Sequence, residues 1–217
     1  FGCSHRGRMI GNFGAAEVFS FHATKFVSAG EGGAITTNDD ELAKRLRRLR
    51  NFGIDGDEIA EVGINGKMSE LAAVMGLTSL ESRQEFVRCN RENQAAYAEA
   101  LADVSGLRLL GMPTGEEHNQ QYVVVEVEPG EAGLSRDQIV SALHAENVLA
   151  KRYFFPGCHR MAPYRAAYDS TRAPLPHTER LCDRLVQLPN GSAVSGDDIW
   201  RIGELLRGLT ARIRRAA

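Results

Sequence analysis

Alternating polar and apolar residues predict two short strands near the start of the chain. The alternation covers residues 17–21 and is typical of a half-buried strand. A second strand is expected over residues 32–37, which begin with glycines. Leucines at helical spacing then follow a capping side chain and several acidic residues, and they predict a helix between Asn38 and Asn51.

A long helical pattern covers residues 69–103, and a break in it is expected near Gly76 or Glu85. The character of the sequence changes near Gly106. The elements predicted beyond this point are a strand over 122–127, a helix from the capping residue Ser135 to about Glu146, an extended segment over 148–155, a helix over 177–185 and an amphipathic helix over 197–214.

These patterns together predict an α/β protein with two domains. The order strand, strand, helix, loop, helix in residues 1–105 suits the edge of an α/β domain, and residues 106–217 suit a small α+β domain. A length of 217 residues with 43% hydrophobic content is sufficient for a substantial core.

The charge balance argues against a polyanionic partner. The formal net charge is −2, and charged residues make up 25% of the chain. The densest basic run, residues 44–50, carries leucines at helical spacing, so a solvated helix face is a better interpretation than a nucleic-acid site. No apolar run reaches membrane-spanning length, so we expect no membrane partner either.

The cysteines give no sign of a metal site. The sequence has four cysteines, none in a CxxC pair, and we expect free thiols, no bound metal and a cytoplasmic protein without a signal peptide. The sequence begins at Phe1, without methionine, and its first segment resembles the middle of a domain. We therefore expect an N-terminal part of a longer protein to precede it.

The segment most suggestive of chemistry is residues 19–35. A strand-like stretch leads into Lys25, which apolar residues flank, and a glycine-rich turn follows. Partial desolvation of a lysine favours its neutral amine, which is the nucleophilic form. Ser20 could donate a hydrogen bond to a phosphate, and glycines let the backbone approach a ligand closely. Taken alone, these features fit a surface lysine better than a functional one.

A family resemblance favours a functional role for Lys25 over that of a surface lysine. Residues 19–25 and 30–35 closely resemble the cofactor-lysine segment of the DegT/DnrJ/EryC1/StrS family of sugar aminotransferases. Further matches, in the family's order, are Phe1-Gly2 with Ile10-Gly11-Asn12-Phe13-Gly14, Asn51-Phe52-Gly53, Gly63 to Glu70, Leu175 to Glu179 and Leu188-Pro189. The resemblance covers essentially the whole chain. It implies the C-terminal part of a fold-type I large domain, residues 1–105, and the small α+β domain that follows it.

The resemblance assigns roles to three residues. The matched lysine of the family binds pyridoxal 5′-phosphate (PLP) covalently, which implies Lys25, and the matched serine contacts the cofactor phosphate, which implies Ser20. The matched asparagine of the glycine-rich loop reaches the phosphate in the other subunit. It implies Asn65 and a homodimer with shared active sites. Without the family, Asn65 would be interpreted as a turn residue beside Gly66.

The resemblance also implies the reaction. Glutamate, the usual donor in this family, leaves its amino group on the cofactor, and a keto-deoxysugar linked to a nucleotide then accepts that group. Lys25 moves the proton, and PLP is the electron sink. Tyr153 and His159 are candidate substrate-binding residues, although a packed loop explains them equally well. The run 151–156 resembles members that aminate the 4-position of the sugar.

Two alternatives remain open at this point. Some relatives are sugar dehydratases in which histidine replaces the lysine, and Lys25 argues against that reaction. The other alternative is a truncated, non-catalytic homologue that acts as a structural or regulatory partner. It stays open because three features of the family lie upstream of the segment that matches Phe1-Gly2. They are the aspartate that pairs with the pyridine nitrogen, the residue that stacks on the ring and the phosphate-binding loop.

Overall fold

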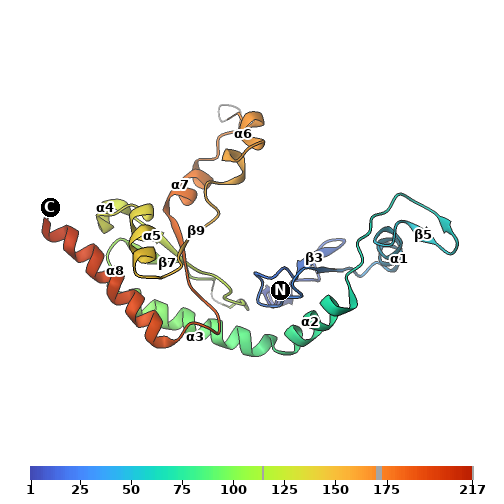
Figure 1. The fold of residues 1–217 in the computed structure, drawn as a ribbon, viewed down its shortest axis with the longest axis horizontal. Coiled ribbons are helices and arrows are strands. Elements are labelled where there is room, and N and C mark those ends of the chain that lie inside the picture. The colour runs from blue at the N-terminus through green and yellow to red at the C-terminus, as the bar shows by residue number, and fades with distance from the viewer. Residues whose placement is uncertain (114, 170–172, 217) are drawn as a thin grey trace. The chain divides into compact units, whose positions relative to one another are not determined.

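The computed structural model describes residues 1–113, 115–169 and 173–216, which fold into two compact units (Figure 1). Unit 1 comprises residues 1–88 and 112–119, and unit 2 comprises residues 89–111 and 120–217. Each unit is thus built from two segments of the chain, because residues 112–119 return to unit 1. The domain boundary at residues 105 and 106 remains a prediction.

Unit 1 contains three antiparallel hairpins. They pair β1 (Ser4–His5) with β2 (Arg8–Met9), β3 (Glu17–Ser20) with β4 (Gly33–Thr36) and β5 (Ile54–Asp55) with β6 (Glu58–Ile59). The strands predicted over 17–21 and 32–37 are confirmed, since β3 and β4 lie within these ranges. The register places Val18 opposite Ile35 and Ser20 opposite Gly33.

The helices of unit 1 begin close to their predicted starts, each at a capping side chain. The Asp39 carboxylate caps α1 (Asp40–Leu49) by accepting from two backbone N–H groups, and Ser69 caps α2 (Glu70–Glu81). The long helical pattern over 69–103 breaks at Ser82, between the predicted sites, and α3 (Arg83–Leu101) continues from unit 1 into unit 2.

Unit 2 is a four-stranded antiparallel sheet with helices on its faces. The strand order is β7 (Leu107–Leu109), β8 (Val123–Val127), β10 (Leu185–Leu188) and β9 (Lys151–Arg152). The helices are α4 (Pro129–Ala132), α5 (Arg136–Ala145), α6 (Tyr164–Ala167), α7 (Pro176–Arg184) and α8 (Gly196–Ala216), with a 3₁₀ turn at Cys158–Arg160. The predicted capping by Ser135 is confirmed as a capping box with Gln138. The extended segment expected over 148–155 contains only the two-residue strand β9.

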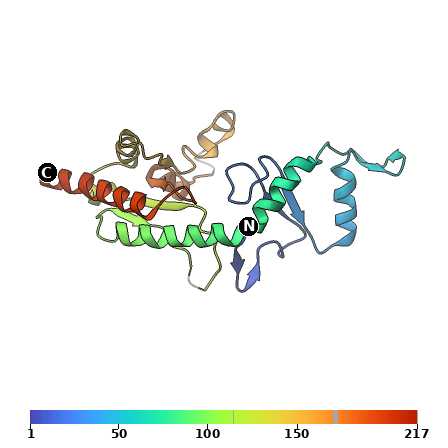
Figure 2. The same cartoon turned by 60° about the horizontal axis from the view of Figure 1, so that its bottom comes forward.

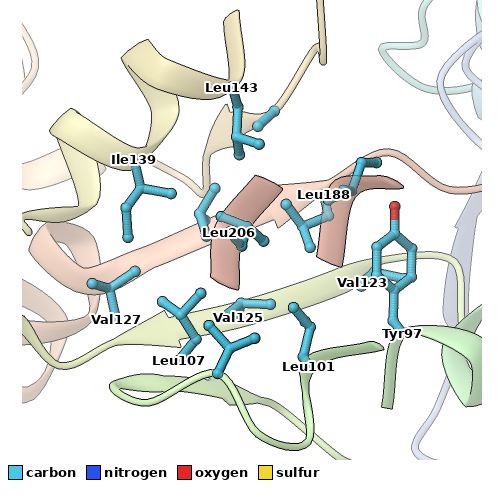
Figure 3. Close-up of a cluster of buried hydrophobic side chains, with 14 of the residues drawn as sticks. Tyr97, Leu101, Leu107, Val123, Val125, Val127, Ile139, Leu143, Leu188 and Leu206 are labelled. Atoms are coloured by element: carbon cyan, nitrogen blue, oxygen red, sulfur yellow. The ribbon is translucent and has the colours of Figure 1, made fainter. Parts of the chain in front are cut away.

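The core of unit 2 is built on β8, whose successive side chains point to opposite faces of the sheet. Val123, Val125 and Val127 belong to one cluster with side chains of α3, α5, α8 and β10 (Figure 3). On the other face, the carboxylate of Glu126 accepts hydrogen bonds from Arg108 and Arg180. The central strand therefore packs on both faces. Helices α3 and α8 run side by side (Figure 2). They approach closely at Gly203, where a Cβ atom would lie 2.9 Å from the Ala100 carbonyl oxygen.

Unit 1 has a much thinner core. Among the described residues of unit 1, the buried apolar side chains are Val27 and Ala29. Many of its large apolar side chains are instead exposed, including Val18 on β3 and Ile35 on β4.

All four cysteines lie in the described part of the chain and are free thiols. Within the same described residues, no helix has the length and apolar character needed to cross a membrane.

We expect Tyr97 to make the stability of unit 2 sensitive to high pH. Its side chain is fully buried in the core (Figure 3), and its hydroxyl donates to the Pro189 carbonyl oxygen at 2.9 Å. Burial first, and then the charge of Asp198, raises the pKa of Tyr97 well above its ordinary value. Because the pKa is higher in the folded state, this contribution is intact below pH ~10 and is lost above it, by about 1.4 kcal/mol per pH unit.

Denaturant unfolding between neutral pH and pH ~11 tests this expectation. Tyr97→Phe should lower the free energy of unfolding by about 1 kcal/mol at neutral pH, because the hydrogen bond is lost. It should also remove the part of the high-pH slope that Tyr97 contributes. The exposed Tyr164 provides the matched control, and Tyr164→Phe should follow the parent protein. Equal slopes for the parent and Tyr97→Phe would contradict the expectation.

Candidate functional site

Lys25 lies in the loop that joins β3 to β4. We call residues 21–32 the Lys25 loop. The backbone N–H of Phe21 donates to the Gly32 carbonyl at 2.9 Å, and the N–H of Ala29 donates to the Phe21 carbonyl at 2.8 Å. These bonds extend the β3–β4 pairing and bring the two ends of the loop together. The loop is therefore a closed structure with defined ends, attached to a hairpin.

Helix α2 anchors the second half of the Lys25 loop. The Ser79 hydroxyl accepts from the Ser28 N–H at 3.0 Å and donates to the Phe26 carbonyl at 3.4 Å. Val27 and Ala29 are each 2% exposed. One hydroxyl thus satisfies backbone groups on both sides of Val27, and the buried side chains fix the segment directly after Lys25.

Aromatic rings also pack around the Lys25 loop. The ring of Phe1 lies 5.6 Å from that of Phe19, 6.3 Å from that of Phe21 and 6.1 Å from that of Phe26, measured between centroids. Such tilted and edge-to-face contacts are favourable for aromatic pairs. Phe1 therefore packs against aromatic side chains of β3 and of the Lys25 loop.

The side chains of Lys25 and Ser20 remain available for a ligand. Lys25 is half-buried, and among the described residues its amine has no hydrogen-bond or ion-pair partner. The Ser20 side chain is exposed, and the one hydrogen bond that its oxygen accepts from the described residues is a long one, 3.3 Å, from the His22 N–H. Gly33 lies opposite Ser20, and a Cβ there would come within 2.6 Å of the Phe19 carbonyl oxygen. Glycine is therefore required at position 33 for this pairing.

Asn65 lies in a loop that the backbone holds firmly. Asn65 forms an isolated β-bridge with Asn51, and the flanking Gly66 N–H donates to the Arg50 carbonyl at 2.8 Å. Its own side chain is exposed and has no partner among the described residues. A Cβ built on Gly32 would lie 2.5 Å from the Met68 sulfur, so the end of this loop touches the Lys25 loop.

Tyr153 and His159 belong to unit 2. The Tyr153 ring lies 5.8 Å from the ring of Tyr122 and 4.5 Å from that of Phe154. Burial first, and then the proximity of Tyr122, raises the pKa of Tyr153. Tyr153 therefore stays a neutral phenol at physiological pH, able to donate or accept a hydrogen bond.

His159 is more enclosed than Tyr153. Its side chain is 8% exposed, and its ring contacts Tyr168 edge-on at 4.9 Å between centroids. The Nε2 atom is buried and has no hydrogen-bond partner among the described residues, although the Glu179 carboxylate lies 3.6 Å away. His159 thus has a buried ring nitrogen whose nearby charged group is the Glu179 carboxylate.

Three residues of the Lys25 loop contact one another in a way that the sequence alone did not reveal: His22, Thr24 and Glu31. The His22 ring contacts Thr24, and its Nε2 atom faces the Glu31 carboxylate at 3.5 Å. Two of these residues precede Lys25 by three positions or fewer, and such closely spaced polar residues before a candidate lysine could have been noticed. Glu31 gave no comparable signal, because its contact forms only when the loop closes.

Comparisons with known proteins identify the family of the chain. The family model of the DegT/DnrJ/EryC1/StrS aminotransferase family matches residues 1–207. The dTDP-4-amino-4,6-dideoxy-D-glucose transaminase of Shigella dysenteriae is 39% identical over 158 residues, which cover 72% of this chain and 42% of that protein. The UDP-4-amino-4-deoxy-L-arabinose–oxoglutarate aminotransferase of Shewanella sediminis (strain HAW-EB3) is 31% identical over 219 residues, which cover 93% and 56%.

A solved structure of similar fold is that of DesI, determined in the presence of its TDP-sugar product. It superimposes with a TM-score of 0.90 and 48% identity over 99% of this chain and 54% of DesI. The chain thus spans about half the length of the relatives it matches. The predicted α/β fold class is confirmed, since the chain shares its fold with solved aminotransferases of this kind. On this evidence the chain belongs to the DegT/DnrJ/EryC1/StrS aminotransferase family.

Proposed function

We propose that the protein containing this chain is a PLP-dependent aminotransferase that transfers an amino group from glutamate to a nucleotide-linked keto-deoxysugar, at the 4-position. The observation that carries the proposal is Lys25, half-buried and without a partner among the described residues, in a firmly anchored loop of a chain of this family. The sugar and the position follow the names of the two relatives above, which both denote 4-amino sugars.

The residues of the chain fit the cofactor. Lys25 offers an amine without a competing partner among the described residues, and Ser20 offers a hydroxyl on the exposed face of β3. Asn65 offers an amide that can donate to a phosphate. When bound, PLP supplies the electron sink for transamination. Lys25 would hold the cofactor covalently, and Ser20 and Asn65 would bind its phosphate.

The anchoring of the loop explains how Lys25 could serve in the reaction. A lysine that holds a cofactor and also moves a proton must return to one position in every cycle. The contacts of Ser79 and the burial of Val27 and Ala29 fix the backbone beside Lys25, while its side chain stays free to move. A rigid backbone under a mobile amine suits both roles.

We propose that Tyr153 and His159 bind the sugar substrate. Tyr153 presents a neutral phenol, and His159 has one buried ring nitrogen without a hydrogen-bond partner among the described residues. Both groups can exchange hydrogen bonds with sugar hydroxyls or a keto oxygen. Loss of either side chain should therefore weaken sugar binding more than the reaction with glutamate.

A second copy of the chain is the partner that we propose for unit 1. Helix α2 exposes large apolar side chains at positions 71, 74, 75 and 77, and Val62 in the preceding loop is 95% exposed. Several large exposed apolar side chains on one helix are typical of a protein interface. Asn65 lies between Val62 and α2, so an interface there would bring Asn65 to the neighbouring subunit's site.

Chemical labelling tests the function directly. After borohydride reduction of the full-length protein loaded with PLP, peptide mapping should place the pyridoxyl group on Lys25. The sequence has three other lysines, Lys44, Lys67 and Lys151, which serve as internal controls. A label on one of these would contradict the assignment, and the absence of any label would favour the non-catalytic alternative.

A further inference from the structure

The turn that presents Lys25 is closed by a side chain as well as by the backbone. The Lys25 N–H donates to the His22 carbonyl at 2.9 Å, which closes a turn over residues 22–25. Inside this turn, the Thr24 N–H lies 3.1 Å from His22 Nδ1, and the Thr24 hydroxyl lies 2.9 Å from the same atom. The imidazole thus holds the residue directly before Lys25.

These contacts determine which nitrogen of the neutral His22 ring carries the proton. A backbone N–H can only donate, so Nδ1 must be the acceptor of the bond from Thr24. The ring proton is then on Nε2, which faces the Glu31 carboxylate at 3.5 Å. Glu31 lies near the far end of the Lys25 loop, six residues after Lys25.

We propose that His22 is a positioning residue for Lys25: its ring closes the turn that carries the lysine and, through Glu31, links the two ends of the Lys25 loop. The inference rests on the proposed function, since it concerns the same lysine. His22 need not touch the substrate or the cofactor for this role. The Thr24 contact should matter more than the Glu31 contact, because the Glu31 side chain is 83% exposed and exposed ion pairs contribute little.

Substitutions of His22 separate turn closure from other roles in the full-length enzyme. His22→Ala removes both links and should raise the PLP release rate about tenfold and lower kcat about tenfold, with KM for the amino donor nearly unchanged. His22→Asn keeps a side-chain acceptor that can reach the N–H two residues ahead. It should recover most of both losses. Glu31→Ala should change either quantity by less than about threefold.

His5 provides the matched control. Its Nδ1 atom lies 3.2 Å from the Glu116 carboxylate, with the side chain 56% exposed, so His5→Ala removes a comparable pair elsewhere in unit 1. His5→Ala should release PLP at the parent rate. If His22→Ala also does so, or if His22→Asn is as impaired as His22→Ala, the proposed role is wrong. Should His22→Ala fail to fold, His22→Asn and Glu31→Ala still decide: a tenfold loss in His22→Asn, or a larger loss in Glu31→Ala, overturns it.

The labelling experiment separates this inference from the proposed function. If the pyridoxyl label is absent from Lys25 in the parent protein, the proposed function fails, whatever the His22 variants do. If the label is on Lys25 and His22→Ala behaves as the parent, the function stands and only the positioning role fails.

Discussion

Lys25→Ala should lower turnover of the full-length protein by more than about 10³-fold, because in the proposed function Lys25 is both the covalent anchor of the cofactor and the group that moves the proton. The Lys25 amine has no partner among the described residues, so its loss should leave the fold intact. Far-UV circular dichroism and the oligomeric state should match those of the parent. Turnover is measured by the formation of the amino sugar from glutamate and the keto sugar.

The control for this variant is Lys44→Ala. Lys44 lies on α1, exposed and paired with Glu41, and its removal should leave turnover unchanged. An added primary amine should partly restore Lys25→Ala, because it can replace the missing proton carrier. Retention of even a tenth of the parent turnover by Lys25→Ala would contradict the assignment.

Mixing two inactive variants should restore activity if the active sites are shared. In a dimer of one Lys25→Ala subunit and one Asn65→Ala subunit, one site carries both substitutions and the other carries none. With random exchange about half of the dimers are mixed, so activity should recover to about a quarter of the parent value. Each variant alone should stay below about a tenth of the parent value, since Asn65→Ala loses a donor to the phosphate.

A double variant controls the mixing experiment. Lys25→Ala mixed with a chain that carries both Lys25→Ala and Asn65→Ala contains no intact site in any arrangement, so it should stay inactive. Subunit exchange is checked with two affinity tags. If exchange occurs and activity does not return, each site is built from a single subunit, and Asn65 has another role.

The sequence predicts the elements whose signals are local. Ser135 caps a helix as predicted, and the helices capped by Asp39 and Ser69 begin close to their predicted starts, because a capping side chain and the N–H groups it binds are two or three residues apart. The alternation over residues 17–21 predicts β3, because that pattern is also contained in a few consecutive residues. The motif around Lys25 is also contiguous, so the family and the candidate lysine can be identified from the order of the residues alone.

Short strands in unit 2 were missed. β10 follows α7 directly and has only four residues, and β7 has three. Both are stabilised by pairing with β8, which is distant in the sequence. Strands this short carry too few residues for an alternating pattern, and their hydrogen bonds depend on the partner.

By itself, therefore, the sequence determined the family, the fold class, the helix starts and the candidate lysine. Only the tertiary structure decided what holds that lysine. Ser79 bonds to a residue 51 positions earlier, and Glu31 reaches His22 only because the Lys25 loop closes. Hydrogen bonds between distant segments depend on how the chain brings those segments together, and no local pattern of polar and apolar residues records that arrangement.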